Sequence, residues 1–394
     1  MDKVTPLYKT LSLPDSFGLK LREGRLSRGL ITAELAESVG VTAQAISQYE
    51  QGRTKPRGDV LAKICTTLNL PLGFFLDENR TIEPPEGPIF FRSLKSSSAR
   101  SQDMMRIRAN WSWRLFSYFE RYIDFPEVKI YEINESKEPG QWAIEQLNQL
   151  AAEVRKNWGL GLGPISNVAA LMENNGVVIS RAYIGDTKLD AFSRWKGNRA
   201  TMFLSSDKES AVRSRFDAAH ELGHLILHTH IDLSEIKDVR QRNKILTLVE
   251  KEANNFAAAF LLPEETFCKE VYSPSIDHFI TLKRRWKVSI AAMIYRCESL
   301  GLLSDNQVLY LRKQMAAKKM RTVEPLDNEL PVEQPSLLAT AIKMMIDNHV
   351  QTPQEISEAL NLPYGDIENL CNLPEHTLKS KEANDNIVPI QFRS

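Results

Sequence analysis

Apolar side chains recur at intervals of three and four positions along most of this chain, which is the period of an amphipathic α-helix. The stretch from Phe216 to His230 shows this period, and Thr247 to Leu262 repeats it. Between positions 177 and 205 the apolar runs are short and predict strands. The predicted strands are Val177 to Ser180, Asp190 to Ser193 and Thr201 to Ser205. The pattern predicts a mainly α fold with a small β-sheet, of the α+β class.

Four short helical patterns, broken by turn signals, open the chain. Between the second and the third lies Val39-Gly40-Val41, where glycine easily adopts a positive φ. Thr42 follows at a position that suits the N-cap of the third helix. A tight turn of this kind, followed directly by an N-cap residue, is typical of a helix-turn-helix. The predicted helices are Phe17 to Arg28, Thr32 to Ser38, Thr42 to Gln51 and Asp59 to Leu68.

The third of these helices has the polar face expected of an element that reads DNA. Ile46 and Tyr49 are expected to face the core, which leaves short polar side chains exposed. Glutamine bonds bidentately to adenine in the major groove, and basic residues just after the helix suit phosphate contacts. Residues 1–70 hold ten Lys and Arg against seven Asp and Glu, a modest positive excess. The predicted DNA-contacting residues are Thr42, Ala43, Gln44, Ser47, Gln48, Arg53, Lys55 and Arg57.

The same stretch contains a set of short motifs, namely Leu35-Ala36, Gly40-Val41-Thr42, Ile46-Ser47, Tyr49-Glu50-Gln51-Gly52 and Pro56. Through these residues it resembles the phage-repressor, or Xre-type, helix-turn-helix family. The resemblance implies binding to double-stranded operator DNA. One position departs from the family: its second helix often opens with a Gln that bonds phosphate, and Thr32 stands there, so we expect a weaker contact. The alternative is a small helical bundle that kept this fold for protein contacts.

The helix predicted from Phe216 to His230 carries two histidines four positions apart, with a glutamate after the first. At 100° per residue, His220 and His224 lie within about 40° of each other, so both imidazoles reach one metal ion. Two neutral imidazoles leave the ion positive and open to water, and Glu221 beside them is the expected general base. The spacing indicates a zinc-peptidase site. The alternative, a core helix with hydrogen-bonded histidines, does not account for two histidines at ligand spacing with a glutamate between them.

A catalytic zinc site of this kind needs a third protein ligand. The next helical pattern, Thr247 to Leu262, offers Glu250 and Glu252, far enough beyond the histidines for a loop and a returning antiparallel helix. Asn254, one turn after Glu250, is placed to hold a ligand by a hydrogen bond. His228, one turn after the second histidine, is also placed to orient a ligand, with an ordinary packed histidine as the alternative.

Arg213 to His224, followed by Glu250 to Pro263, resembles the ImmA/IrrE family of metallopeptidases. The resemblance spans roughly Ala151 to Leu303 and implies a minigluzincin-like peptidase domain that holds one Zn²⁺. It also implies limited cleavage of a repressor protein in a stress response or in mobile-element induction. The implied metal ligands are His220, His224 and Glu250, with Asn254 as a hydrogen-bonding partner and Glu252 as the weaker candidate ligand.

Composition restricts the partners and the compartment. Lys plus Arg and Asp plus Glu both number 50, so no global field attracts polyanions, and any nucleic-acid surface is local. The four scattered cysteines form no Cys-x-x-Cys pair, which favours reduced thiols over a disulfide framework or a cysteine zinc site. The sequence shows neither a signal peptide nor an uncharged apolar run long enough for a bilayer. We therefore expect a cytoplasmic protein without a membrane contact.

The order of these features predicts the domain organisation. An aromatic, basic helix, Met104 to Phe125, is expected to pack on the peptidase domain. Residues 350–376 hold five Asp and Glu and no Lys or Arg, so the last helices are expected to bind protein, with a homodimer as one such contact. The predicted parts are a helix-turn-helix domain (1–79), a linker (80–102), a peptidase domain (103–323, core 151–303), a connector (324–335), a small helical unit (336–379) and a disordered tail (380–394).

The sequence leaves three questions open, namely which strand binds the substrate, which side chain stabilises the oxyanion, and what the function is. Zinc peptidases of this general build bind the substrate main chain along an edge strand, for which Thr201 to Ser205 is the candidate. Tyr183, Tyr295 and Arg296 are candidates for stabilising the oxyanion, without a choice among them. The leading function is a DNA-binding zinc metallo-endopeptidase that cleaves a repressor. The alternative is a transcription regulator whose peptidase-like domain is a non-hydrolytic sensor or an antitoxin-like partner module.

Overall fold

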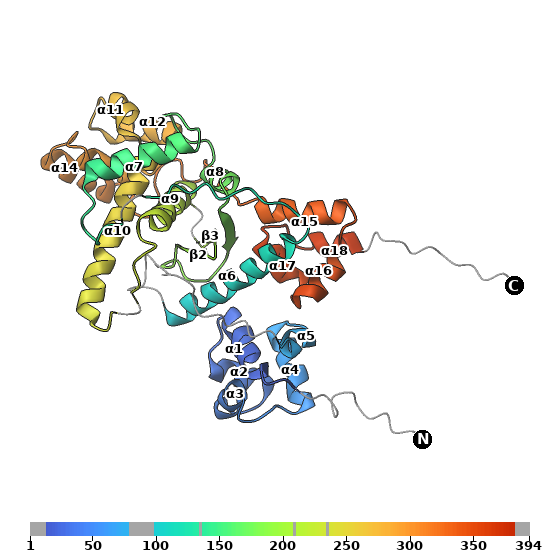
Figure 1. Cartoon of the computed structure of the whole chain (residues 1–394). Coiled ribbons are helices and arrows are strands. Elements are labelled where there is room, and N and C mark those ends of the chain that lie inside the picture. The colour runs from blue at the N-terminus through green and yellow to red at the C-terminus, as the bar shows by residue number, and fades with distance from the viewer. Residues whose placement is uncertain (1–12, 79–97, 134–135, 208–209, 234–235, 383–394) are drawn as a thin grey trace, which may run out of the picture. The chain divides into compact units, whose positions relative to one another are not determined.

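The computed structural model describes residues 13–78, 98–133, 136–207, 210–233 and 236–382. The chain divides into two compact units, and its elements are labelled in Figure 1. The described part of the first unit consists of residues 13–78, 98–124 and 338–382, and that of the second lies within 125–337. In sequence, the second unit is thus inserted into the first. The described residues are mostly helical and contain one three-stranded sheet, which confirms the predicted α+β class.

The N-terminal part of the first unit is the predicted helix-turn-helix bundle. Gly40 ends α2 with a φ of 77°, a left-handed conformation that favours glycine. Thr42 caps α3, because its Oγ1 accepts a hydrogen bond from the Ala45 N–H at 3.1 Å. Ile46 is fully buried, as expected, and Tyr49 is half-buried. The five helices are α1 (Phe17–Ser27), α2 (Thr32–Val39), α3 (Ala43–Glu50), α4 (Gly58–Leu68) and α5 (Leu72–Leu76).

The aromatic helix α6 (Ala99–Phe119) belongs to this first unit and packs against α1. Its Trp111 is fully buried, and the indole N–H donates to the Glu23 carboxylate at 2.6 Å. The expectation that this helix packs on the peptidase domain was therefore wrong. A buried aromatic stripe shows that a helix has a partner, but it does not say which partner.

The C-terminal helices complete the first unit. The Arg28 guanidinium forms two hydrogen bonds of 2.6 Å with the Asp366 carboxylate, and Arg114 donates to the Leu360 carbonyl at 2.8 Å. The acidic segment thus makes contacts within the chain, and the predicted contact with another protein, including a homodimer, stays a prediction. The helices are α15 (Leu337–Asp347), α16 (Pro353–Leu360), α17 (Tyr364–Leu370) and α18 (Thr377–Glu382).

The second unit contains the sheet, whose strands are β1 (Val178–Ala182), β2 (Ala191–Lys196) and β3 (Arg199–Ser205). The strand order is β1-β3-β2, with β1 parallel and β2 antiparallel to β3. β3 is therefore central, and the prediction that Thr201 to Ser205 forms the edge was wrong. The two edge strands of this sheet are β1 and β2, and β2 packs against α9.

Helices cover the sheet and form most of the apolar core of the second unit. The central pair is α9 (Ala211–Leu227) and α10 (Val239–Leu261), which pack closely together. Gly223 allows this approach, because a Cβ at its position would lie 3.2 Å from the Ala253 Cα. The remaining helices are α7 (Ile144–Asn157), α8 (Val168–Asn174), α11 (Glu264–Glu270), α12 (Ile276–Trp286), α13 (Ile290–Ser299) and α14 (Asp305–Ala317).

Two predicted segments fall largely outside the described residues. The predicted linker 80–102 is described only from residue 98, and the predicted tail 380–394 only to residue 382. The predicted domain boundaries stay predictions. None of the helices in the described residues is both long and apolar enough to cross a membrane.

Candidate metal centre

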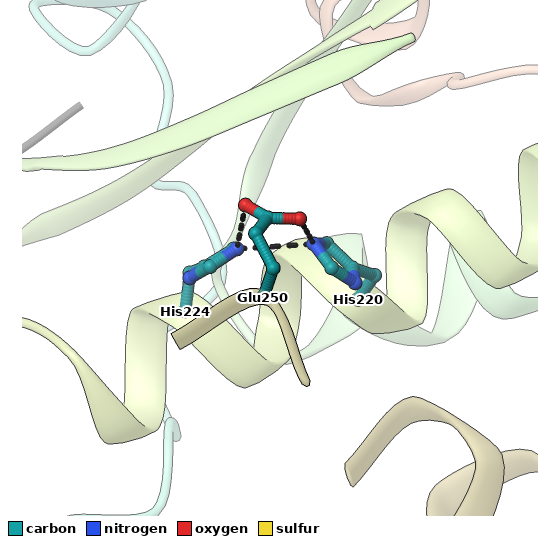
Figure 2. A group of neighbouring side chains, drawn as sticks. All are labelled: His220, His224 and Glu250. Atoms are coloured by element: carbon teal, nitrogen blue, oxygen red, sulfur yellow. Dashed lines mark hydrogen bonds and ion pairs between the residues drawn. The ribbon is translucent and has the colours of Figure 1, made fainter. Parts of the chain in front are cut away.

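The structure brings His220, His224 and Glu250 together between α9 and α10 (Figure 2). The two histidine Nε2 atoms are 3.0 Å apart. The Glu250 carboxylate reaches both rings, with Oε2 at 3.3 Å from His220 Nε2 and Oε1 at 3.4 Å from His224 Nε2. One potential ligand atom from each of the three residues thus lies within 4.8 Å of the other two, as a metal ligand group requires.

This arrangement fits a tetrahedral zinc ion. Two ligand atoms about 2.05 Å from zinc at the tetrahedral angle are about 3.3 Å apart, which is close to the separations seen here. Glu250 Oε1 is buried and accepts no hydrogen bond from the described residues. A buried carboxylate oxygen without a hydrogen bond is costly unless a cation compensates it. The geometry and this oxygen both favour a metal ligand set of two imidazoles and one carboxylate.

The electrostatics at Glu250 are consistent with a ligand carboxylate. Burial acts to raise the pKa of Glu250, but the neighbouring imidazoles of His220 and His224 outweigh it and hold that pKa far below its ordinary value. The carboxylate is therefore ionised at neutral pH, which is the form that binds a cation.

Glu221, the predicted general base, is buried next to the ligand histidines in α9. The Ser193 hydroxyl donates a 2.7 Å hydrogen bond to Glu221 Oε2 and also reaches the Glu221 main-chain oxygen at 3.1 Å. Ser193 lies on the edge strand β2, so this contact ties the carboxylate to the sheet. Sequence reasoning missed Ser193, because a serine in a short strand carries no signal of such a role.

Asn254 lies one turn beyond Glu250 and contacts the first ligand histidine. Its Oδ1 is 3.1 Å from His220 Nδ1. An amide oxygen only accepts hydrogen bonds, so His220 Nδ1 carries the proton and Nε2 is the nitrogen whose lone pair would bind a metal. The structure therefore places Asn254 where the sequence predicted a hydrogen-bonding partner of a ligand.

His228 and Glu252 form a second polar group behind His224. His228 Nδ1 is 3.0 Å from His224 Nδ1, and His228 Nε2 is 3.1 Å from Glu252 Oε2. Burial lowers the pKa of His228 to about 4, despite the opposing effect of Glu252. Glu252 thus lies outside the three-residue ligand group and contacts His228 instead of a metal position, so the weaker ligand candidate is not supported.

A groove of about 420 Å³ opens beside the ligand histidines and the edge strand. His224 and Ser193 line it together with other polar or charged side chains, namely Glu132, Ser136, Arg194 and Thr229, and with six side chains that are mostly apolar. These are Ile130, Tyr131, Ile133, Trp195, Leu225 and Ile226. The groove therefore offers a partly apolar surface next to the candidate metal position.

The structure assigns no oxyanion-stabilising side chain among the three candidates. Tyr295 donates to Asn255 Oδ1 at 2.5 Å, and buried Arg296 donates to the Leu262 carbonyl and to Asn148 Oδ1. Tyr183 is 64% exposed. The described contacts thus place none of the three at the ligand group, and the choice stays open.

The predicted DNA-contacting residues gather on α3 and on the turn that follows it. Most are exposed, while Ser47 and Gln48 are half-buried. Two basic residues of the turn have contacts of their own, since Lys55 donates to the Leu13 carbonyl and Arg57 lies 3.4 Å from Asp59. Arg53 and the α3 side chains form the core of the predicted surface. The exposed members are Thr42, Ala43, Gln44, Arg53, Lys55 and Arg57.

Comparison with protein families finds a match for each of two regions, the one with the candidate metal ligands and the one with the predicted DNA-contacting residues. Residues 172–298 match the family described as the IrrE N-terminal-like domain. The chain contains an IrrE-like domain. The matched range includes all three strands, α9, α10 and the three candidate ligands. Residues 21–75 match a helix-turn-helix family, so both predicted resemblances are confirmed.

Individual relatives match parts of the chain. One relative is the "Radiation response metalloprotease IrrE" of Deinococcus radiodurans, which is 35% identical over 86 residues, or 21% of this chain and 26% of that protein. "Transcriptional regulator ClgR" of Mycobacterium tuberculosis is 39% identical over 56 residues, or 14% of this chain and 50% of that protein. The chain therefore spans half or less of the length of these curated relatives.

A solved structure titled "Mycobacterium tuberculosis transcriptional regulator" aligns with 50% of this chain and 54% of its own. The TM-score is 0.29 and the sequence identity is 17%. This likeness is too slight to define the fold or the function.

Proposed function

We propose that this chain is a DNA-binding zinc metallo-endopeptidase of the cytoplasm that regulates transcription by limited cleavage of a repressor protein. The observation that carries the proposal is the convergence of His220, His224 and Glu250 on one point, with Glu221 next to the first ligand. The match of the IrrE-like domain and the printed name of its metalloprotease relative support the same chemistry.

The residues divide the chemistry among them. His220, His224 and Glu250 would hold Zn²⁺, which when bound would supply a Lewis acid that polarises a carbonyl and lowers the pKa of water toward about 7. Glu221 takes a proton from the attacking water and passes it to the leaving amine. The Ser193 hydroxyl holds Glu221 Oε2 in place, so the base is oriented before a substrate arrives.

The edge strand β2 and the adjacent groove supply a place for a peptide. An extended peptide adds to a sheet edge through main-chain hydrogen bonds, and pockets beside the edge select its side chains. Apolar side chains, including Trp195 and Ile226, form about half of the lining of the groove beside β2. We therefore propose a peptide substrate bound along β2 with an apolar side chain in this groove.

The helix-turn-helix domain supplies the second part of the proposed function. Its α3 presents Gln44 on an exposed face and is followed by exposed Arg53. Glutamine reads adenine in the major groove, and arginine after the helix binds phosphate. The printed name of one relative that matches part of this chain is that of a transcriptional regulator. We propose double-stranded operator DNA as the partner.

The first experiment combines zinc content with peptide cleavage. Wild type, Glu250→Ala and Glu221→Gln are purified, their zinc is measured by mass spectrometry, and each is incubated with a quenched-fluorescence peptide library. We expect about one zinc per chain in wild type and in Glu221→Gln, and none in Glu250→Ala. Cleavage should fall by about 10²-fold or more in Glu221→Gln, because the proton acceptor is lost while the metal remains.

Each alternative result changes the proposal in a defined way. Cleavage that survives Glu221→Gln removes the general-base assignment. Wild type without zinc after refilling removes the metallopeptidase and favours the non-hydrolytic regulator. Wild type with zinc that cleaves no library peptide favours a metal-holding sensor or partner-binding module instead.

DNA binding is tested by selecting duplexes from a random library with the wild-type chain. Gln44→Ala combined with Gln48→Ala should lose about tenfold or more of the preference for the selected duplex over random DNA, because base contacts specify sequence. Arg53→Ala should weaken binding to both duplexes alike and reduce the salt dependence, because phosphate contacts carry no sequence information. A chain that selects no duplex would contradict the proposed partner and support protein contacts for this domain.

A further inference from the structure

His228 and Glu252 form a chain of hydrogen bonds that ends at His224. The direction of each hydrogen bond in this chain follows from which atoms can donate. The Gly140 and Trp142 main-chain N–H groups both donate to Glu252 Oε1, at 2.8 and 3.2 Å. The other oxygen, Oε2, faces His228 Nε2 at 3.1 Å. A carboxylate only accepts hydrogen bonds, so His228 Nε2 carries a proton.

That assignment fixes the next hydrogen bond. In a neutral imidazole with a proton on Nε2, Nδ1 carries a lone pair and accepts. The contact between His228 Nδ1 and His224 Nδ1, 3.0 Å long, needs one donor, which must then be His224. His224 therefore has its proton on Nδ1 and its lone pair on Nε2. This is the nitrogen that faces His220 and Glu250.

We propose that Glu252 and His228 form a hydrogen-bond relay that fixes His224 in the tautomer able to bind the metal, with both acting as positioning residues. The relay rests on the metal site of the proposed function. It also explains why Glu252 has both oxygens engaged away from the ligand group. Asn254 sets the tautomer of His220 by a single contact, whereas His224 depends on a chain of two residues and a main-chain turn.

The main-chain turn makes a sharp test available. In Glu252→Gln, the Gly140 and Trp142 N–H groups still require an acceptor, so they hold the amide oxygen on their side. The amide NH₂ then faces His228 Nε2 and donates to it. His228 must move its proton to Nδ1 and donate to His224, which places the His224 proton on Nε2, against the metal. The substitution thus reverses the relay with almost no change in shape.

Zinc affinity is the readout, measured by competition with a chromophoric chelator. We expect Glu252→Gln to bind zinc about 10- to 100-fold more weakly than wild type, the usual effect of losing a partner that orients a ligand. The matched control is Glu173→Gln, which changes another buried glutamate that accepts main-chain N–H groups, those of Ser336 and Leu337. Glu173→Gln should bind zinc within about twofold of wild type.

A double-mutant cycle separates the relay from a structural effect of the turn. His228→Phe removes the acceptor of His224, and in that background Glu252→Gln should weaken zinc binding no further, because its effect passes through His228. An equal loss in both backgrounds would overturn the relay and assign Glu252 to the turn alone. An unchanged affinity in Glu252→Gln would overturn it as well.

A second measurement detects the tautomer in the wild-type protein itself. In the zinc-loaded wild type, ¹⁵N shifts of labelled histidine report the tautomer of His228, whose signal is identified by its loss in His228→Phe. A proton on Nε2 is expected, and a proton on Nδ1 would overturn the relay. If the wild type binds no zinc, the metal site itself is overturned. If the wild type binds zinc and Glu252→Gln binds it with the same affinity, the relay alone is overturned.

Discussion

His228 is a fully buried imidazole, and its surroundings decide its charge. Burial disfavours the charged ring and lowers its pKa to about 4, from about 6.5 in the unfolded chain. Between these values the unfolded chain binds a proton that the folded chain does not bind. The free energy of unfolding of the metal-free protein therefore falls as the pH drops from about 6.5 to about 4.

The pH dependence of stability tests this directly. The His228 contribution is fully present above pH about 6.5 and is lost by pH about 4, with a size on the order of 3 kcal/mol. Metal-free His228→Phe lacks this contribution, so its stability should fall less over the same range. Chemical denaturation at a series of pH values gives both curves. Parallel curves would contradict the assignment of a neutral buried ring.

The sequence identifies those site residues that are brought together by the regular spacing of a single helix. His220 and His224 lie four positions apart, so the geometry of one helix places them together without knowledge of the fold. Glu250 and Asn254 follow from a second helix, with a choice left between Glu250 and Glu252. Ser193 could not be found this way, because its contact with Glu221 depends on how a strand packs against a helix.

The pair α9 and α10 is the element that holds the metal site together. Two candidate ligands come from α9 and the third from α10, so the separation of the two helices sets the size of the site. At Gly223 a Cβ would meet the Ala253 Cα and the Phe256 ring, both at 3.2 Å. The Ala253 main chain cannot yield in the way that the end of a flexible side chain can.

Gly223→Val should therefore destabilise the protein by about 1 to 3 kcal/mol, the usual cost of overpacking, and should weaken zinc binding. Thermal unfolding and chelator competition measure the two effects. The matched control is Gly365→Val in α17, where a Cβ meets nothing within 4 Å. The control should change stability little. Equal melting temperatures for the two variants would contradict the proposed role of Gly223.

Element positions were predictable where a period or a cap marks them. The helices α1 to α4 were predicted within about one residue of their observed ends, and Gly40 and Thr42 mark the boundary between α2 and α3. The aromatic helix α6 was predicted less well, since it runs from Ala99 to Phe119 rather than from Met104 to Phe125. α10 begins at Val239, earlier than the predicted Thr247, because the Asp238 side chain caps it ahead of a polar stretch. The order of the strands was not predictable, since pairing depends on contacts between segments rather than on the pattern within each.

On the scale of the whole molecule, the first unit joins three separate segments of the chain. The helix-turn-helix segment, α6 and the C-terminal helices meet in one core, with the Arg28–Asp366 pair as a link between its first and last parts. The sequence predicted each segment as helical but assigned α6 to the wrong neighbour. Amphipathic patterns identify a buried face, and only the three-dimensional structure identifies what covers it.

This discontinuous unit has a consequence during protein synthesis. Arg28 and Asp366 are 338 positions apart, and ribosomes add about 5 to 20 residues per second. Roughly 17 to 70 seconds thus pass between the synthesis of Arg28 and that of its partner. During this interval the side of α6 that later binds α16 and α17 has no C-terminal helices to cover it. The nascent chain must remain soluble with that surface uncovered until α16 and α17 have been synthesised.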